Sequence, residues 1–197
     1  IPDYIWNADD GRIGVRYSHL GEANRLTRVS LPSGGTYQMS YALNDDGPES
    51  NMRHYVMSSL TVKDNRMQAP NQHRRFLYAR RHYDRIERQD YGYAEVVTIE
   101  DSASLPDYRH TVRQFHNQDY LFRGLCHSTA VIDGSNQDTL SATRHEYRLF
   151  EIASGDLIPG SGPGCYGDGF PAMLFDSTLY YDGGERQIVS RLRFGYT

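Results

Sequence analysis

The chain has 197 residues, which corresponds to one domain of ordinary size or to two small ones. Its net charge of −4 argues against a general nucleic-acid binder, because the usual footprint of such proteins is a basic domain. No apolar run approaches the ~20 residues that span a bilayer. Tyrosine occurs 16 times and glycine 18 times, and every basic residue except Lys63 is arginine. The chain opens with Ile1-Pro2-Asp3 and no methionine, so we expect it to be part of a longer chain.

Short alternating segments fill the first part of the chain. The alternation of apolar and polar residues predicts strands within 13–17, 26–31, 36–41 and 55–62, separated by turn residues at 9–11, 32–35 and 44–48. Tyr17, Val29 and Tyr41 recur at the constant interval typical of an antiparallel meander. Residues 64–74 are polar and are expected to form a surface loop.

The stretch 74–90 is compatible with a charged helix or with a pair of strands, since no glycine or proline interrupts it. Residues 91–99 predict a clear strand. Further strand candidates, taken in chain order, are 109–115, 121–132, 141–149, and a final hairpin of 177–181 with 187–196. Residues 155–169 contain glycine and proline throughout and predict a mobile surface loop with little to pack. No linker divides the chain, so the sequence predicts a single all-β, antiparallel segment.

Motifs for chemistry are weak. Residues 162–167 match the pattern GxGxxG, but they lack the preceding strand and following helix that a dinucleotide site needs. Cys126 and His127 are neighbours on a predicted strand and therefore point to opposite faces, which disfavours a nucleophile–base pair. We expect no enzymatic activity and no cofactor, and we expect alanine at Cys126, His127 or Asp168 to leave any chemistry of the parent protein unchanged.

Metal sites are also not indicated. The eight histidines show neither HExxH nor a short paired spacing suited to zinc. The acidic loops 44–47 and 133–138 lack the closing glutamate of a twelve-residue calcium loop. Whether Cys126 pairs with Cys165 is left open by the sequence.

Charged residues of both signs alternate through the central segment. Carboxylate pairs such as Glu87 with Asp90 have no defined separation of the kind that glycosidase chemistry requires. The arginines between 74 and 88 are interleaved with aromatic and acidic residues. This mixture favours ion pairs across neighbouring strands over a single-strand-binding surface.

Two central motifs resemble a known family. Residues 83–96, Tyr-Asp-Arg-Ile-Glu-Arg-Gln-Asp-Tyr-Gly-Tyr-Ala-Glu-Val, resemble a YYDRREREFYGFAKV-like signature in the B component of bacterial insecticidal toxin complexes and in SpvB-like virulence proteins. Residues 111–125 resemble the T..QTFHND.YYLKGL pattern of the same family. Weaker similarities are those of 31–41 to PLGG...F.Y and of 180–197 to YEGG...Y.YD, the start of an Rhs (YD) repeat.

The resemblance implies a non-enzymatic structural segment of an Rhs-type shell, in which β-strands spiral into a hollow cocoon around a toxic carboxy-terminal polypeptide. The chain would form part of the cocoon wall, and 74–90 would be a strand pair with Gly92 at a bend or bulge. Its partners would be the rest of the toxin chain, the other toxin-complex components and the enclosed segment, with no nucleic acid and no direct membrane insertion. The parent would be a secreted bacterial toxin that carries its own export signal. The family-motif residues expected to act structurally are Tyr83, Asp84, Arg85, Glu87, Arg88, Tyr91, Gly92, Phe115, Gly124 and Leu125.

Two other functions remain open at this point. A carbohydrate- or surface-binding β-module would present exposed tyrosines and Trp6 on one sheet face. A hydrolase would present a cleft with convergent carboxylates of perturbed pKa.

Overall fold

A computed structural model describes residues 14–20, 23–44, 54–64, 70–101, 106–164, 168–182 and 185–195. Several features singled out in the sequence therefore lie outside the described residues: the turn at 9–11, most of the loop at 44–48, Trp6, Cys165, and the ends of the GxGxxG and YD-like motifs. Within the described ranges no helix is long and apolar enough to cross a membrane.

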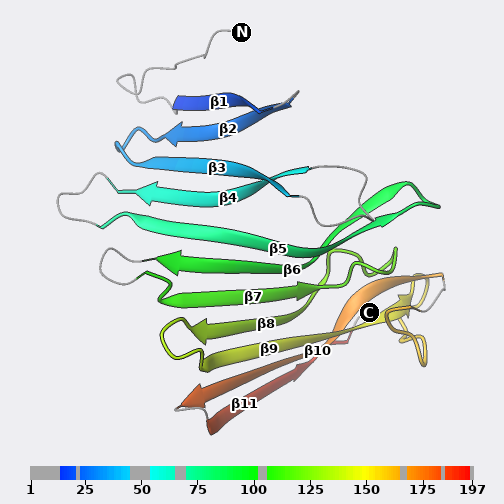
Figure 1. Ribbon diagram of the computed structural model, residues 1–197. Coiled ribbons are helices and arrows are strands. Elements are labelled where there is room, and N and C mark those ends of the chain that lie inside the picture. Colours follow the sequence, from blue (N-terminus) through cyan, green and yellow to red (C-terminus); the bar gives the residue numbers. More distant parts are fainter. Residues whose placement is uncertain are drawn as a thin grey trace. The chain divides into compact units, whose positions relative to one another are not determined.

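All regular structure in these ranges is β-strand, and the strands hydrogen-bond in chain order in one eleven-stranded sheet (Figure 1). The strands are β1 (Gly14–Leu20), β2 (Ala23–Ser30), β3 (Thr36–Asn44), β4 (His54–Lys63), β5 (Gln72–Asp84), β6 (Gln89–Asp101), β7 (Arg109–Phe115), β8 (Cys126–Asp133), β9 (Thr139–Glu151), β10 (Gly169–Asp182) and β11 (Glu185–Arg193). Antiparallel registers join β1 through β5 in sequence, and likewise β7 through β11. The predicted all-β, antiparallel fold is confirmed.

Residue contacts divide the chain into two compact units. Among the described residues, the first contains β1 to β4, β5 up to Leu77, and β6 from Thr98 on to Tyr108. The second contains the remainder of β5 and β6, from Tyr78 to Val97, and everything described from Arg109 onward. Each unit is an antiparallel meander in its own right.

Few apolar side chains are fully buried. In the second unit the buried apolar residues are Tyr91, Phe122, Leu149, Phe150 and Leu174, with Phe122 at 0% and Leu149 at 1% exposure. Most other strand residues are half-buried on both faces, as the burial patterns of β4, β8 and β10 show. A sheet with little core explains why the sequence is polar and rich in tyrosine, because a tyrosine ring packs on neighbouring strands while its hydroxyl reaches water.

Three sequence predictions of local structure need correction. The expected loop at 64–74 ends earlier, since Gln72 and Arg74 already pair with β4. The expected strand at 121–132 begins only at Cys126, because residues 121–124 form turns. Gly124 adopts a φ of 76° there and returns its N–H to the carbonyl of His116 at 2.8 Å, which closes the connection. For residues 74–90, where the sequence allowed a helix or a strand pair, the structure confirms the strand pair.

The third correction concerns the loop at 155–169. Ser161 is 4% exposed, and its hydroxyl accepts a hydrogen bond from the N–H of Leu149 at 3.0 Å. Leu157 forms a bridge with Phe150 on β9. The loop is irregular as predicted, but the prediction that it has little to pack is wrong for Ser161 and Gly162, which are buried. The buried hydroxyl of Ser161 and the backbone hydrogen bond from Ile158 to the Leu149 carbonyl at 3.0 Å dock the loop on β9.

Candidate functional site

The first family motif builds the turn between β5 and β6. The carboxylate of Asp84 accepts hydrogen bonds from the backbone N–H groups of Ile86 and Glu87, both at 2.8 Å. An aspartate side chain commonly accepts such hydrogen bonds from turn N–H groups, which is why aspartate is frequent in turns. Arg88 completes the turn with a φ of 53°, and Arg85 is exposed beside it. These residues shape a hairpin.

Tyr91 anchors the start of β6. It is 6% exposed, and its hydroxyl donates a hydrogen bond to the Glu87 carboxylate at 2.6 Å. This hydrogen bond, with burial and the nearby charge of Glu87, raises the pKa of Tyr91 to about 12. The guanidinium of Arg123 lies 5.4 Å from the ring centroid of Tyr91, so the second motif packs on the first.

Arginines of β5 pair with carboxylates of β6. Arg81 contacts Asp90 at 2.6 Å with its own side chain only 3% exposed, and Arg80 contacts Glu95 at 3.0 Å. In the other unit Arg74 contacts Glu100 at 3.2 Å. Arg75 likewise contacts Asp101 at 3.3 Å, so the predicted cross-strand ion pairs are confirmed and include four arginines of the central cluster.

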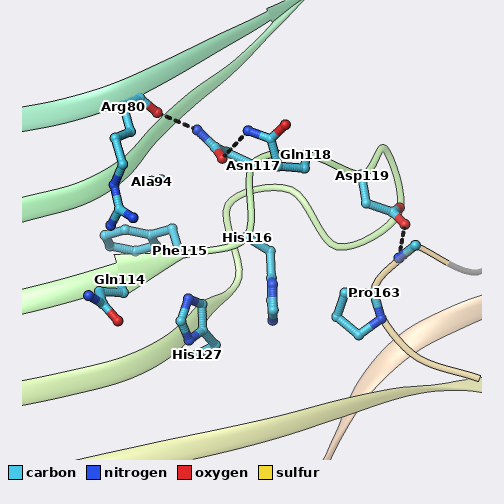
Figure 2. Close-up of a pocket in the computed structure, with 11 residues that line it drawn as sticks. Arg80, Ala94, Gln114, Phe115, His116, Asn117, Gln118, Asp119, His127 and Pro163 are labelled. Atoms are coloured by element: carbon cyan, nitrogen blue, oxygen red, sulfur yellow. Dashed lines mark hydrogen bonds between the residues drawn. The ribbon is translucent and has the colours of Figure 1, made fainter.

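Asn117 joins the two motifs, and sequence analysis missed its role. Asn117 is 2% exposed. Its side-chain amide donates hydrogen bonds to the carbonyl oxygens of Arg80 at 2.7 Å and Gly92 at 3.1 Å, and Figure 2 shows the first of these. Both residues have a left-handed backbone, with φ of 56° at Arg80 and 78° at Gly92. Such residues interrupt the regular ladder and free their carbonyls, which then need another partner. The asparagine of the His-Asn-Gln-Asp segment was the signal that could have indicated this.

The remaining motif residues close the connection between β7 and β8. Phe115 is the last residue of β7. Leu125 donates its N–H to the carbonyl of Phe122 at 3.1 Å, and its own carbonyl accepts from His116 at 3.0 Å. Tyr83, at the end of β5, is half-buried. The structure thus brings Phe115, Gly124 and Leu125 together around one connection, with Gly92 linked to it through Asn117.

An open groove lies beside this connection and has a volume of about 460 Å³. It is lined by Arg80, Ala94, Gln114, Phe115, His116, Asn117, Gln118, Asp119, His127, Pro163 and Gly164 (Figure 2). Asp119 accepts hydrogen bonds from the N–H groups of Leu121 at 2.8 Å and Gly164 at 2.6 Å, so its carboxylate fastens loops. Among the described residues no group of three or more His, Cys, Asp or Glu is arranged to hold a metal ion.

Cys126 and His127 are adjacent in sequence, but their side chains lie in different surroundings. The Cys126 thiol is free and contacts the carbonyl of Ser128 at 3.3 Å and the hydroxyl of Thr129 at 3.5 Å. His127 instead lines the groove and stacks on His116, with the ring centroids 4.6 Å apart. The groove therefore offers amides, two imidazoles and an ion-paired arginine, a set suited to hydrogen bonding.

Comparison with known proteins gives matches by structure only. No protein-family profile matches the sequence. No curated protein matches it either. The crystal structure of TcdB2-TccC3 is similar with a TM-score of 0.59 and 9% identity, covering 79% of this chain and 11% of that chain. TcdB2-TccC3 without its hypervariable C-terminal region gives a TM-score of 0.58 at 10% identity, covering 79% and 10%.

The Tc holotoxin pore of Photorhabdus luminescens is also similar, with a TM-score of 0.57 and 9% identity over 82% of this chain and 10% of that chain. The chain therefore spans about a tenth of the length of these solved chains. At such low identity the likeness shows the fold alone: this β-sheet is of the kind found in toxin-complex chains.

Proposed function

We propose that the chain is a non-enzymatic structural segment of an Rhs-type toxin-complex shell, which encloses a toxic polypeptide and helps to deliver it. The observation that carries this proposal is the fold likeness to TcdB2-TccC3 chains over most of the present chain. The two central motifs add to it, because they resemble sequences of the same class of toxin.

The geometry of the motif residues supports a structural role. Asp84 shapes the β5–β6 turn, Tyr91 is buried, and Gly92 takes a backbone conformation that glycine adopts at low cost. Gly124 does the same in the β7–β8 connection. We assign these and the other motif residues to holding the sheet in shape, with residues 1–197 acting as one segment of a larger shell.

The two outermost strands of the sheet, β1 and β11, offer edges on which the shell can assemble. β1 pairs with β2 and β11 pairs with β10, and in the described sheet each is an outermost strand. The outer edge of such a strand presents unpaired N–H and C=O groups, which are templates for another strand. In the proposed shell these edges pair with the rest of a secreted toxin chain, whose other components and enclosed segment are the partners of this wall.

The test separates a wall from an enzyme. In the full-length protein that contains the chain, Cys126→Ala and Asp168→Ala should leave the chemical activity of the toxic part unchanged. Phe115→Ala should lower the yield of assembled shell and the protease protection of the enclosed polypeptide, while the toxic part, once purified alone, keeps its activity. A Cys126→Ala protein that assembles normally but loses chemical activity would overturn the proposal, and specific binding of the chain on a glycan array would favour a carbohydrate-binding module instead.

A further inference from the structure

Two histidines from different elements stack in the groove beside the β7–β8 connection. His116 directly follows β7 and His127 is the second residue of β8. Their ring centroids are 4.6 Å apart with an angle of 35° between the planes, and Figure 2 shows the two rings side by side. The rings of Phe122 and Tyr147 meet His116 edge-on at 6.1 Å and 6.2 Å. The imidazoles are therefore packed in a partly apolar setting and are not free on the surface.

The pair lies where the β7–β8 connection, residues 116–125, is fastened to the sheet. The backbone of His116 donates to Leu125 and accepts from Gly124, so His116 closes both ends of the connection. The side chain of the next residue, Asn117, donates hydrogen bonds to the carbonyls of Arg80 and Gly92. The connection also carries Phe122, which is 0% exposed. Displacement of His116 would disturb each of these contacts.

The charges that face the pair differ in sign. Arg80 of β5 contributes a cation that faces His127, and it is itself paired with Glu95 of β6 at 3.0 Å. Asp119 of the connection faces His116 and favours its charged form, but the carboxylate is occupied by backbone N–H groups.

From β9, the ring of Tyr147 faces the pair. The Tyr147 hydroxyl of β9 donates a hydrogen bond to the Cys126 carbonyl at 3.0 Å.

The protonation state at neutral pH follows from burial. Burial lowers the pKa of His116, and the neighbouring His127 lowers it further, against the opposing effect of Asp119. Burial also lowers the pKa of His127, with Arg80 acting in the same direction. Both rings are therefore uncharged near pH 7, which is the state in which two imidazoles stack without repulsion.

We propose that the His116–His127 stack is an acid-sensitive latch, which fastens the connection 116–125 to the sheet at neutral pH and releases it on acidification. Two imidazolium ions at this separation in a partly buried site repel each other. The unfolded or detached rings bind protons at the ordinary histidine value, about 6.5. Stability of the closed connection therefore falls as the pH drops below that value, and the loss is complete below the lowered pKa values of the folded pair.

The experiment is hydrogen–deuterium exchange of the chain at pH 7.5 and pH 5.0, corrected for the intrinsic pH dependence of exchange. We expect exchange of the peptide 116–125 to rise several-fold at the lower pH. His116→Gln and His127→Gln each replace one ring by a neutral group that does not titrate, and each should abolish this rise. His54→Gln, on β4 in the other unit, removes a histidine elsewhere and should retain it.

A second measurement needs no variant. In histidine side-chain NMR titration of the wild-type chain, His116 and His127 should titrate below the ordinary value and as a coupled pair. The proposal is overturned if exchange of 116–125 shows no rise at pH 5.0, if the rise persists in both glutamine variants, or if the two rings titrate independently at the ordinary value.

Discussion

The side-chain amide of Asn117 donates a hydrogen bond of 2.7 Å to the backbone carbonyl of Arg80, thirty-seven residues earlier in the chain. The same amide group reaches the carbonyl of Gly92 at 3.1 Å. One buried side chain thereby serves the carbonyls of two residues with a left-handed backbone, Arg80 and Gly92. The contact ties the two motifs with family resemblance into a single structural unit.

Removal of this amide should destabilise the second unit. We expect Asn117→Ala to lower the free energy of unfolding by about 1–3 kcal/mol, because the carbonyls it serves lose their partner in a buried place. Asn136→Ala, in the exposed turn after β8, is the matched control and should cost less than about 0.5 kcal/mol. Urea denaturation of both variants measures the difference. Equal effects of the two substitutions would show that the Asn117 contact contributes nothing specific.

Gly92 should resist substitution for reasons of backbone geometry alone. A Cβ built at Gly92 meets nothing within 4 Å, so alanine causes no clash, yet the φ of 78° lies in the left-handed region. We expect Gly92→Ala to cost about 1–2 kcal/mol. Gly195 also has open space around a Cβ but lacks a positive φ, so Gly195→Ala should be close to neutral in thermal unfolding. A neutral Gly92→Ala would contradict the view that the left-handed backbone at this position requires glycine.

The Tyr91–Glu87 hydrogen bond should be visible in a spectrophotometric titration. The pKa of Tyr91 is raised from an ordinary 10.0 to about 12, first of all by the bond to Glu87. Glu87→Gln should lower it toward the ordinary value, whereas Tyr78, whose pKa is raised by burial and by Tyr93, should not change. The wild type should also lose stability faster than the variant between pH 10 and pH 12, since its unfolded form ionises there first. If the absorbance titrations of the wild type and Glu87→Gln at 295 nm superimpose, the Tyr91–Glu87 hydrogen bond does not set the pKa of Tyr91.

The docked loop after β9 should depend on Ser161. Its hydroxyl accepts from the N–H of Leu149 at 3.0 Å and donates to the carbonyl of Leu149 at 3.3 Å. Ser161→Ala should cost about 1–3 kcal/mol by leaving a buried N–H without a partner, and it should speed hydrogen exchange at Leu149. Ser190→Ala on the exposed face of β11 should leave both measurements unchanged. Unaltered exchange at Leu149 in Ser161→Ala would mean that the loop docks by other contacts.

Sequence alone predicted most of the strands, because alternation and turn residues are local signals. The predicted strand at 109–115 has the same bounds as β7. For residues 74–90 the residue spacing also allowed a helix, and the family resemblance favoured the strand pair that the structure shows. The failures share a different cause. The burial of Phe122 turns 121–124 away from a strand, and Ser161 docks a loop whose composition suggests nothing to pack.

The candidate site shows the same division between local and distant information. The motif predicted Gly92 at a bend or bulge, and its φ of 78° departs from regular strand backbone, whereas the turn contacts of Asp84 were not predicted. The link from Asn117 to Arg80, and the stack of His116 on His127, depend on which strands become neighbours. No spacing along the chain encodes such contacts, since they join residues brought together by the sheet.

The most direct test of the proposed shell is electron cryomicroscopy of the full-length protein that contains this chain. We predict that β1 and β11 are each hydrogen-bonded on their outer edges to further strands of a closed wall around the enclosed polypeptide. A map in which these eleven strands form a separate module with both outer edges free, apart from any wall, would contradict it.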